Sequence, residues 1–437
     1  MKIVNLSGKT GDAVLSSLLN RDLSSYSSYR EPVEKIVQNV RENGDRALLS
    51  YTAEFDRFKC TSKGLEVTEK EIRSAIRETD PALLSVMKKA IENIRAYHEK
   101  QKRNSWFDAE KEGIILGQKV TPLERVGVYV PGGKAAYPST VLMNIVPAKV
   151  AGVKEIIMVS PVRDGKINPV TVAAAHLAGA DRIFRIGGAQ AVAALAYGTK
   201  TIPKVDKIVG PGNVYVAMAK KCVYGYTGID SIAGPSEITI IADHTADPSF
   251  VAADLLSQAE HDEMASAVLI TTSRILAGRV SKEVDLFLKK LSRKDIIKKS
   301  LDNNGMILIA KDLPQAADFA NRIASEHLEL ITENPFELMS RIRNAGAIFL
   351  GPYSSEPLGD YFAGPDHVLP TSGTARFFSP LSVDDFIKKS SVIYYSEDAL
   401  KRVSADIRKF AKAEGLTAHA NSIAVRFNGK KKQRKEK

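Results

Sequence analysis

Hydrophobic and polar positions alternate with two different periods, which divides the chain into a helical beginning and a longer part of strands and helices. Over residues 29–57 and 66–103, apolar residues recur at helical spacing, with a break at Gly44. The second stretch has Thr68 followed three residues later by Glu71, the pattern of a capping box. The beginning of the chain is therefore predicted to form polar-faced scaffold helices.

From residue 121 the pattern changes to short apolar runs that end in glycine turns and are separated by segments that suit short helices. The runs are RVGVYVPGG (125–133), EIIMVSP (155–161), DRIFRIGG (181–188), KIVGPGN (207–213) and SIAGPSEITIIAD (231–243). This alternation predicts a parallel α/β sheet, whose ligands lie at the carboxyl ends of the strands. Glycine turns at that edge let the backbone approach a phosphate closely. The dinucleotide pattern G-x-G-x-x-G is absent, because Gly210-Pro211-Gly212 is followed by Asn213, Val214 and Tyr215.

A second α/β stretch covers residues 245–380, and the segment from 382 has a mixed helix and strand pattern. With 437 residues, 44% hydrophobic and 26% charged, the composition is that of a soluble globular protein of roughly two to four domains. No apolar run approaches the ~18 residues of a membrane span, and no secretory signal pattern begins the chain. Cys60 and Cys222 cannot form a disulfide framework, so a reducing, cytoplasmic location is expected.

Much of the net charge of +11 lies at the end of the chain. Residues 430–437 carry six Lys or Arg and one Glu, a charge of +5, which leaves +6 for the rest. A basic end of this kind is typical of a solvated tail. Aromatic residues are not interleaved with the basic ones, so a nucleic-acid partner is not expected.

The seven histidines are the first candidates for chemistry. His98, His176 and His244 have sequence surroundings typical of structural histidines. Gln258 and His261 are three residues apart on a predicted helix and share one face, which suits a metal but is not specific to one. Glu326-His327 stands where a helix is predicted to meet a strand. From the residues alone, this pair is either a proton-transfer pair or a solvated helix end.

The chain resembles the histidinol dehydrogenase family from about residue 30 to 426. The motifs that carry the resemblance, in order, are RVGVYVPGGKAAYPSTVLMNIVPAKVAGV, RIGGAQAVAALAYGT, KIVGPGNVYVAMAK, IAGPSEI, DLLSQAEHD, ASEHLEL, GDYFAGPDHVLPTSGTARF and EGLTAHANSIAVR. The resemblance implies oxidation of L-histidinol through L-histidinal to L-histidine with two NAD+, which ends histidine biosynthesis. It also implies one zinc ion per subunit.

The resemblance also implies roles for individual residues. The zinc ligands are expected to be Gln258, His261, Asp360 and His419, the last from the partner subunit of a homodimer with shared active sites. His327 is expected to take the alcohol proton, and Glu326 to activate water against the aldehyde. The remaining expected contacts are Ser236, His367 and Glu414 to the substrate, together with His327 and the zinc ligands, and Tyr129, Gln190 and Asn213 to NAD.

The expected fold has two incomplete Rossmann-like domains with parallel sheets and a mixed dimerising extension. Residues 25–128 and 237–381 are expected to form the domain with zinc and the catalytic residues, residues 129–236 the NAD-binding domain, and residues 1–24 and 382–437 the extension. A thiol route through a covalent intermediate is not expected, because neither cysteine falls in a motif.

Two other functions compete with this interpretation. One is a relative on the same scaffold that oxidises another alcohol, such as a sulfonated diol. Glu414 and His419 favour an amino-imidazole substrate instead. The other is a zinc-binding or nucleic-acid-binding protein without activity, which would not need Glu326 and His327 together.

Overall fold

The computed structural model describes residues 1–6, 16, 27–132, 136–162 and 165–428. They form two compact units, a main unit within residues 1–102 and 122–386 and an extension within residues 103–121 and 387–437. The basic tail and most of the segment before residue 27 lie outside the described residues. No helix in the described part combines the length and apolar character that crossing a bilayer requires.

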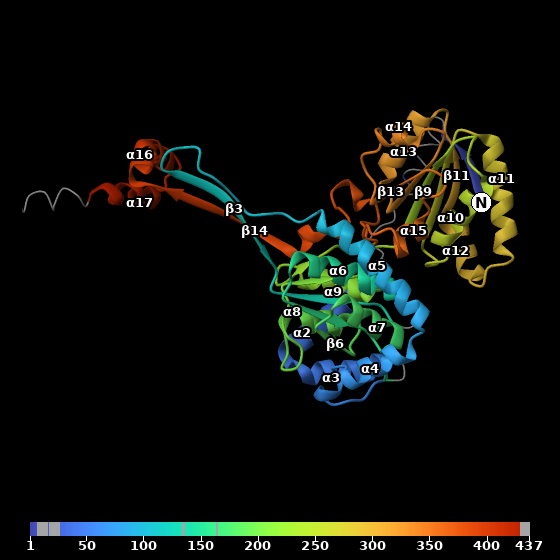
Figure 1. The fold of residues 1–437 in the computed structure, drawn as a ribbon, viewed down its shortest axis with the longest axis horizontal. Helices are drawn as coiled ribbons and strands as arrows, with labels where there is room; N and C mark the ends of the chain where they lie inside the picture. Colours follow the sequence, from blue (N-terminus) through green and yellow to red (C-terminus); the bar gives the residue numbers. More distant parts are fainter. Residues whose placement is uncertain (7–15, 17–26, 133–135, 163–164, 429–437) are drawn as a thin grey trace, which may run out of the picture. The chain divides into compact units, whose positions relative to one another are not determined.

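The main unit contains two parallel sheets with the same topology (Figure 1). The larger has the order β1 (Lys2–Asn5), β11 (Gly305–Ile309), β10 (Ser266–Thr271), β9 (Glu237–Ala242), β12 (His327–Ile331), β13 (Ala347–Leu350). The smaller has the order β6 (Arg182–Phe184), β5 (Glu155–Val159), β4 (Arg125–Tyr129), β7 (Lys207–Val209), β8 (Gly228–Ile229). Apart from β1, each sheet starts at a central strand, adds two strands on one side and then two on the other. This is the winding of an incomplete Rossmann sheet, and the predicted fold class is confirmed.

Helices cover both faces of the six-stranded sheet. One apolar core lies under α10 (Pro248–Ala259), α11 (Arg274–Leu288) and α12 (Lys294–Asn304), and the other under α13 (Leu313–Ile323) and α14 (Pro335–Met339). Every residue of β9, β10 and β12 is buried, as expected for parallel strands covered on both faces. The short helix α15 (Glu356–Tyr361) follows β13.

The five-stranded sheet has two layers of helices on each face. The inner helices are α6 (Pro138–Ala151) and α7 (Pro169–Ala178) on one face, and α8 (Gly188–Tyr197) and α9 (Val214–Val223) on the other. The outer helices are α4 (Glu69–Glu78) and α5 (Pro81–Glu99) over α6 and α7, and α2 (Ser27–Asn43) and α3 (Asp45–Phe55) over α8 and α9.

Two segments pack differently from the expected division of the chain. The helices of residues 27–99 share their cores with the five-stranded sheet, whereas residues 25–128 were expected to group with the zinc-binding domain. Strand β1 pairs with β11 in the six-stranded sheet, whereas residues 1–24 were expected in the extension. Helical periodicity shows that a helix has an apolar face but not which sheet that face covers, so packing decides the grouping.

The helix boundaries in the first part follow the predicted signals. Gly44, with φ of 52°, separates α2 from α3. The Thr68 side chain accepts a hydrogen bond from the backbone N–H of Glu71, and the Glu71 carboxylate accepts one from Thr68 N at 2.9 Å. This reciprocal pair is the predicted capping box at the start of α4.

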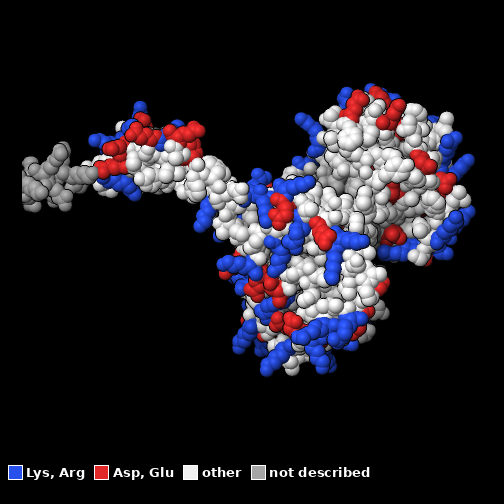
Figure 2. Space-filling model, viewed as in Figure 1, with Lys and Arg blue, Asp and Glu red and all other residues white. Residues whose placement is uncertain are grey.

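The extension mixes strands and helices, as predicted for the segment from 382. A three-stranded sheet has the order β14 (Ile387–Tyr395), β3 (Ile114–Pro122), β2 (Trp106–Asp108), and two helices follow, α16 (Glu397–Ala413) and α17 (Thr417–Asn428). Single 3-10 turns occur in the main unit at Ser62–Gly64, Thr374–Arg376 and Val383–Phe386. On the face that Figure 2 draws, acidic and basic side chains are interspersed, as on an ordinary solvated surface.

Gly210 and Gly225 offer a matched test of the close approach between β4 and β7. Their φ angles are +102° and +100°, but a Cβ on Gly210 would lie 2.1 Å from Tyr129 O, whereas a Cβ on Gly225 would meet nothing within 4 Å. We expect Gly225→Ala to cost about 1–2 kcal/mol of stability, the cost of a left-handed residue. Gly210→Ala should lower the thermal unfolding midpoint more than Gly225→Ala does, because the added Cβ would force Tyr129 at the end of β4 to shift. Equal midpoints for the two variants would contradict this packing.

Candidate active site

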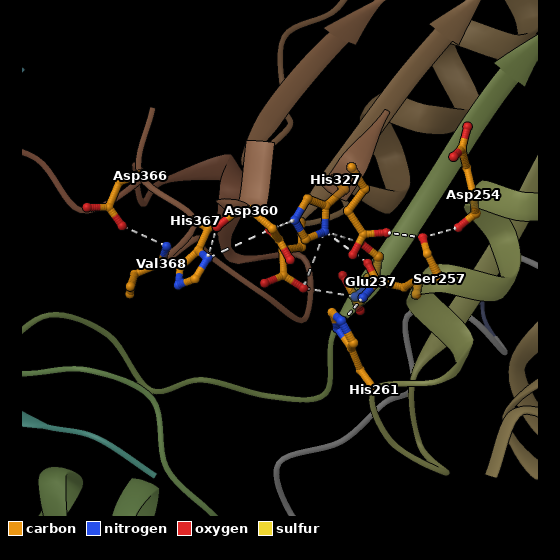
Figure 3. A network of polar contacts seen from close by, with 12 residues as sticks. Glu237, Asp254, Ser257, His261, His327, Asp360, Asp366, His367 and Val368 are labelled. Atoms are coloured by element: carbon orange, nitrogen blue, oxygen red, sulfur yellow. Dashed lines mark hydrogen bonds and ion pairs between the residues drawn. The ribbon is translucent and has the colours of Figure 1, made fainter. Parts of the chain in front are cut away.

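A cluster of buried polar side chains lies at the amino ends of β9 and β12 (Figure 3). Helix α13 ends at Ile323, and Ala324, with φ of 53°, turns the chain toward the strand. Glu326 precedes β12 and His327 is its first residue. The predicted junction of helix and strand is therefore confirmed. Glu326 and His327 are only 6% and 3% exposed, so the alternative of a solvated helix end is wrong.

The two ring nitrogens of His327 have different surroundings. Its Nδ1 lies 2.9 Å from Gln258 Oε1 and 3.2 Å from Glu237 O, two acceptors that place the proton on Nδ1. Its Nε2 is buried, lies 3.8 Å from Asp360 Oδ1 and has no hydrogen-bond partner among the described residues. Nε2 is therefore the ring nitrogen that the surrounding protein leaves without a partner.

Glu326 is held by the neighbouring strand. Its Oε2 accepts a hydrogen bond from Glu237 N at 2.9 Å and lies 3.8 Å from His327 Nδ1. The Glu326 carboxyl and Nε2 of His327 therefore lie at different positions. That the two residues serve separate steps stays a prediction.

Three residues offer ligand atoms to a cation: His261 in the turn after α10, and Glu356 and Asp360 on α15. Atoms of His261, Glu356 and Asp360 all lie within 4.8 Å of one another. Gln258 joins this group through its Nε2, 3.1 Å from His261 Nδ1. Figure 3 shows His261, His327 and Asp360 turned toward one another. The structure thus brings together three of the four predicted zinc ligands.

Glu356 is a site residue that the sequence reasoning missed. It is buried in the first turn of α15, four residues before Asp360, so the two carboxyls share one face of the helix. The sequence EPLGDY contained this signal, but the helix is too short to be recognised from periodicity.

Burial and the neighbouring charges together set the protonation of the cluster. Burial raises the pKa of Glu326 to about 8 and that of Glu356 to about 7. Burial also disfavours the charged form of His327, but Glu326, Asp360 and Glu356 outweigh it and raise the pKa to about 10. Burial opposes ionisation of Asp360 as well, yet the neighbouring histidines lower its pKa. A cluster with this excess of acidic groups fits a bound cation.

The cluster opens into a pocket of about 680 Å³, which is large enough for a small-molecule substrate. His327, Asp360 and His367 line it, together with β13 and residues 379–382. His367 Nδ1 lies 3.0 Å from Asp360 O, so the predicted substrate contact stands beside a predicted ligand. Ser236, directly before β9, lies at the amino end of the same strands.

Glu414 and His419 belong to the other compact unit. Glu414 follows α16, His419 lies on α17, and both are exposed. Their contribution to the pocket stays a prediction.

The carboxyl end of the five-stranded sheet holds the three residues that were predicted to contact NAD. Tyr129 ends β4, Gln190 lies in the first turn of α8, and Asn213 caps α9. Strands β4 and β7 flank the point where the strand order reverses, which is where nucleotides bind such sheets. The Tyr129 hydroxyl accepts a hydrogen bond from Gly188 N at 3.0 Å, which orders the glycine turn before α8. Both amide atoms of Gln190 are buried and lack a partner within the described ranges.

Asp56 is a second residue that the sequence reasoning missed. It follows α3 and accepts a hydrogen bond from the backbone of Gly187, so it lies at the turn that leads into α8. Burial raises its pKa to about 6. Its position depends on how the outer helices pack, and nothing in the local sequence indicates it.

Both cysteines pack against the core of the five-stranded sheet and not against the polar cluster. Burial raises the pKa of the Cys60 and Cys222 thiols. A raised pKa leaves little reactive thiolate, which agrees with the expected absence of a thiol route.

Comparisons with known proteins agree on one family. The family model described as histidinol dehydrogenase matches residues 19–427. A histidinol dehydrogenase from Clostridium acetobutylicum is 55% identical over 428 residues, which cover 98% of this chain and 99% of the relative. One from Aquifex aeolicus is 57% identical over 400 residues, 92% of this chain and 93% of the relative. The crystal structure of histidinol dehydrogenase from Elizabethkingia anophelis superposes with a TM-score of 0.90 at 36% identity, covering 98% of both chains.

Lys220 and Asp230 offer a test of how the turn after β7 is held in place. The two form a buried ion pair, Lys220 Nζ donates to Gly210 O at 3.0 Å, and Asp230 Oδ2 accepts from Gly210 N at 2.7 Å. We expect Lys220→Met to cost about 3–5 kcal/mol of unfolding free energy, because it leaves a buried carboxylate without its cation. Adding Asp230→Asn should recover part of the loss in denaturant unfolding. A double variant no more stable than the single one would contradict this account.

Proposed function

Because this chain belongs to the histidinol dehydrogenase family, we propose that its buried polar cluster binds zinc and L-histidinol. We propose that NAD binds at the carboxyl end of the five-stranded sheet. The chain is an oxidoreductase that acts on the CH–OH group of L-histidinol and forms L-histidine through L-histidinal, at the end of histidine biosynthesis. A different alcohol, such as a sulfonated diol, is not favoured, because the relatives that match almost the whole chain are histidinol dehydrogenases.

One observation carries the proposal. The buried His327 presents a free Nε2 to the pocket directly beside the group of His261, Glu356 and Asp360. A polar atom that is buried without a partner costs free energy, so its retention supports a role toward a ligand.

The donor set fits zinc. Gln258, His261 and Asp360 supply oxygen and nitrogen donors without a thiolate, as in sites that keep a position open for substrate. The excess of buried carboxyl groups around them favours a divalent cation. When bound, zinc supplies a Lewis-acid centre that orients the amino and imidazole nitrogens of the substrate. We infer from the family resemblance that His419 of the partner subunit is the remaining ligand.

His327 is proposed as the base of the first oxidation. A bound divalent cation would offset the neighbouring carboxylates that raise the pKa of His327, and Nε2 would then be free of its proton. Gln258 Oε1 holds the proton on Nδ1, so Nε2 takes the hydroxyl proton of histidinol while the C–H hydrogen leaves as hydride. NAD+ bound at the carboxyl end of the five-stranded sheet would supply the hydride acceptor.

Glu326 is proposed to act on the aldehyde. With a pKa raised to about 8, Glu326 is the carboxylate in slightly alkaline solution, which suits a general base. In that form it takes a proton from the water that adds to L-histidinal, and the hydrated aldehyde then gives the second hydride. Glu237 N fixes the Glu326 carboxyl through Oε2, so the carboxyl is held in a defined position.

Stoichiometry and metal dependence test this function together. We expect two NADH per histidinol consumed, loss of activity on treatment with a chelator, and recovery with Zn2+. His261→Ala should lower turnover at least about 100-fold and lower the zinc content, because it removes a ligand. Absorbance at 340 nm and metal analysis measure both. Turnover of another alcohol but not of histidinol would overturn the proposal.

A mixing experiment tests the shared site. His261→Ala and His419→Ala are each expected to be inactive alone. In a dimer with shared sites, random mixing should restore about a quarter of wild-type activity, because half the dimers then contain one intact site of two. Each variant remixed with itself is the control. Absence of recovery, with dimer exchange confirmed by mass, would contradict a shared site.

A further inference from the structure

One segment of the main unit leads from β8 of the five-stranded sheet to β9 of the six-stranded sheet. We call residues 230–237 the crossing segment. It begins at Asp230, whose Oδ2 accepts a hydrogen bond from Gly210 N at 2.7 Å in the turn after β7. It ends at Glu237, whose N–H donates to Glu326 Oε2 at 2.9 Å. The crossing segment therefore contacts the turn after β7 at one end and a proposed catalytic residue at the other.

One side chain holds the middle of the crossing segment. Gly234 N donates a hydrogen bond to Thr371 Oγ1 at 2.6 Å, and Thr371 is only 4% exposed. Gly234 lies two residues before Ser236, a predicted substrate contact. Thr371 lies four residues after His367, which lines the pocket. A single hydroxyl group thus joins the two segments that carry these predicted contacts.

The backbone around Thr371 turns sharply where it meets the crossing segment. Thr374 N and Thr374 Oγ1 both donate to Thr371 O, at 3.1 and 2.7 Å. The two residues between them are left-handed, Ser372 with φ of 55° and Gly373 with φ of 73°. A left-handed serine is unfavourable, so the surrounding structure must hold this turn. A Cβ on Gly234 would collide with Ser372 Oγ, which shows how closely the turn and the crossing segment approach.

The chain between Gly234 and the site is short and stiff. Only Pro235 and Ser236 separate Gly234 from Glu237, and the ring of Pro235 fixes its φ. Ser236 O accepts a hydrogen bond from Ser266 N at 3.0 Å, and β9 begins at the next residue. A displacement of Gly234 would therefore also displace Ser236.

We propose that Thr371 is a positioning residue whose hydroxyl fixes the spacing between Ser236 and His367, and through it the efficiency with which L-histidinol is oxidised. Thr371 touches neither the substrate nor the metal in this role. The inference rests on the proposed function, in which Ser236 and His367 contact the substrate.

Three variants of Thr371 separate the hydroxyl from the shape of the side chain. Thr371→Val keeps the shape but leaves Gly234 N without its acceptor. Its kcat/KM for L-histidinol should fall at least about 10-fold, since small displacements of groups that orient a substrate lower the rate strongly. Thr371→Ser keeps the hydroxyl and should stay within about threefold of wild type. Thr371→Ala should resemble Thr371→Val, and it takes the place of that variant if the valine folds poorly.

Two further measurements distinguish positioning from general damage. The KM for NAD+ should stay within about twofold of wild type, because Lys220 and Asp230 hold the turn after β7 without Thr371. The zinc content should also be unchanged, because Thr371 lies neither on α10 and the turn after it nor on α15, the elements of the proposed ligands.

Thr79 provides the matched control. Its hydroxyl also makes a hydrogen bond to the backbone, donating to Ala75 O at 2.8 Å, and it is 2% exposed at the end of the outer helix α4. Thr79→Val should lower the thermal unfolding midpoint and leave kcat/KM near wild type.

Four outcomes would overturn the inference. Thr371→Val could keep wild-type kcat/KM, or Thr371→Ser could lose as much as Thr371→Val. The KM for NAD+ could rise as much as that for histidinol. Alternatively, Thr371→Val and Thr79→Val could lose kcat/KM in proportion to their thermal midpoints, which would make the hydroxyl merely structural. Failure of the unaltered protein to oxidise histidinol would refute the proposed function itself, and that failure is seen without any Thr371 variant.

Discussion

The burial of polar groups at the amino edge of the six-stranded sheet is the constraint on which the site depends. His327 is enclosed by α10, β9 and α15, and its polar neighbours belong to these elements or to the junction before β12. Because buried polar atoms need partners, the elements around the ring cannot move independently without exposing an unsatisfied group. The one nitrogen without a partner, Nε2, is the atom that faces the pocket. The surrounding structure satisfies one side of the ring and leaves the other for a ligand.

The two sheets share a winding order but use opposite edges. The residues predicted to contact NAD lie at the carboxyl ends of β4 and β7, the edge where glycine turns and helix N-termini gather. Glu326, His327 and Glu237 lie instead at the amino ends of β12 and β9. The carboxyl edge of the larger sheet is occupied by tight turns such as Asp243 with Thr245 and Glu333. A rule drawn from strand order alone would therefore have placed the chemistry of this sheet at the wrong edge.

The sequence predicted the parallel α/β fold, the capping box at Thr68 and the junction at Glu326, because each depends on local periodicity or local hydrogen bonds. It did not predict which sheet the first helices cover, since an amphipathic face fits many partners. Gln258 and His261 were recognised by a motif, and their meeting with Asp360 depends on long-range packing. Glu356 and Asp56 were missed because their roles arise from contacts between distant segments. The predictions of zinc and NAD came from the family resemblance and not from the spacing of residues in the sequence.

The composition of α8 has a consequence for nucleotide binding at the carboxyl end of the five-stranded sheet. Five of its ten residues are alanines, all buried, at positions 189, 191, 193, 194 and 196. Alanine has no side-chain rotamers to lose, so packing α8 into the core of the five-stranded sheet costs little side-chain entropy. We therefore expect α8 to lose little conformational entropy when a nucleotide binds beside it. What remains to be ordered is the ligand itself and the turns in front of it.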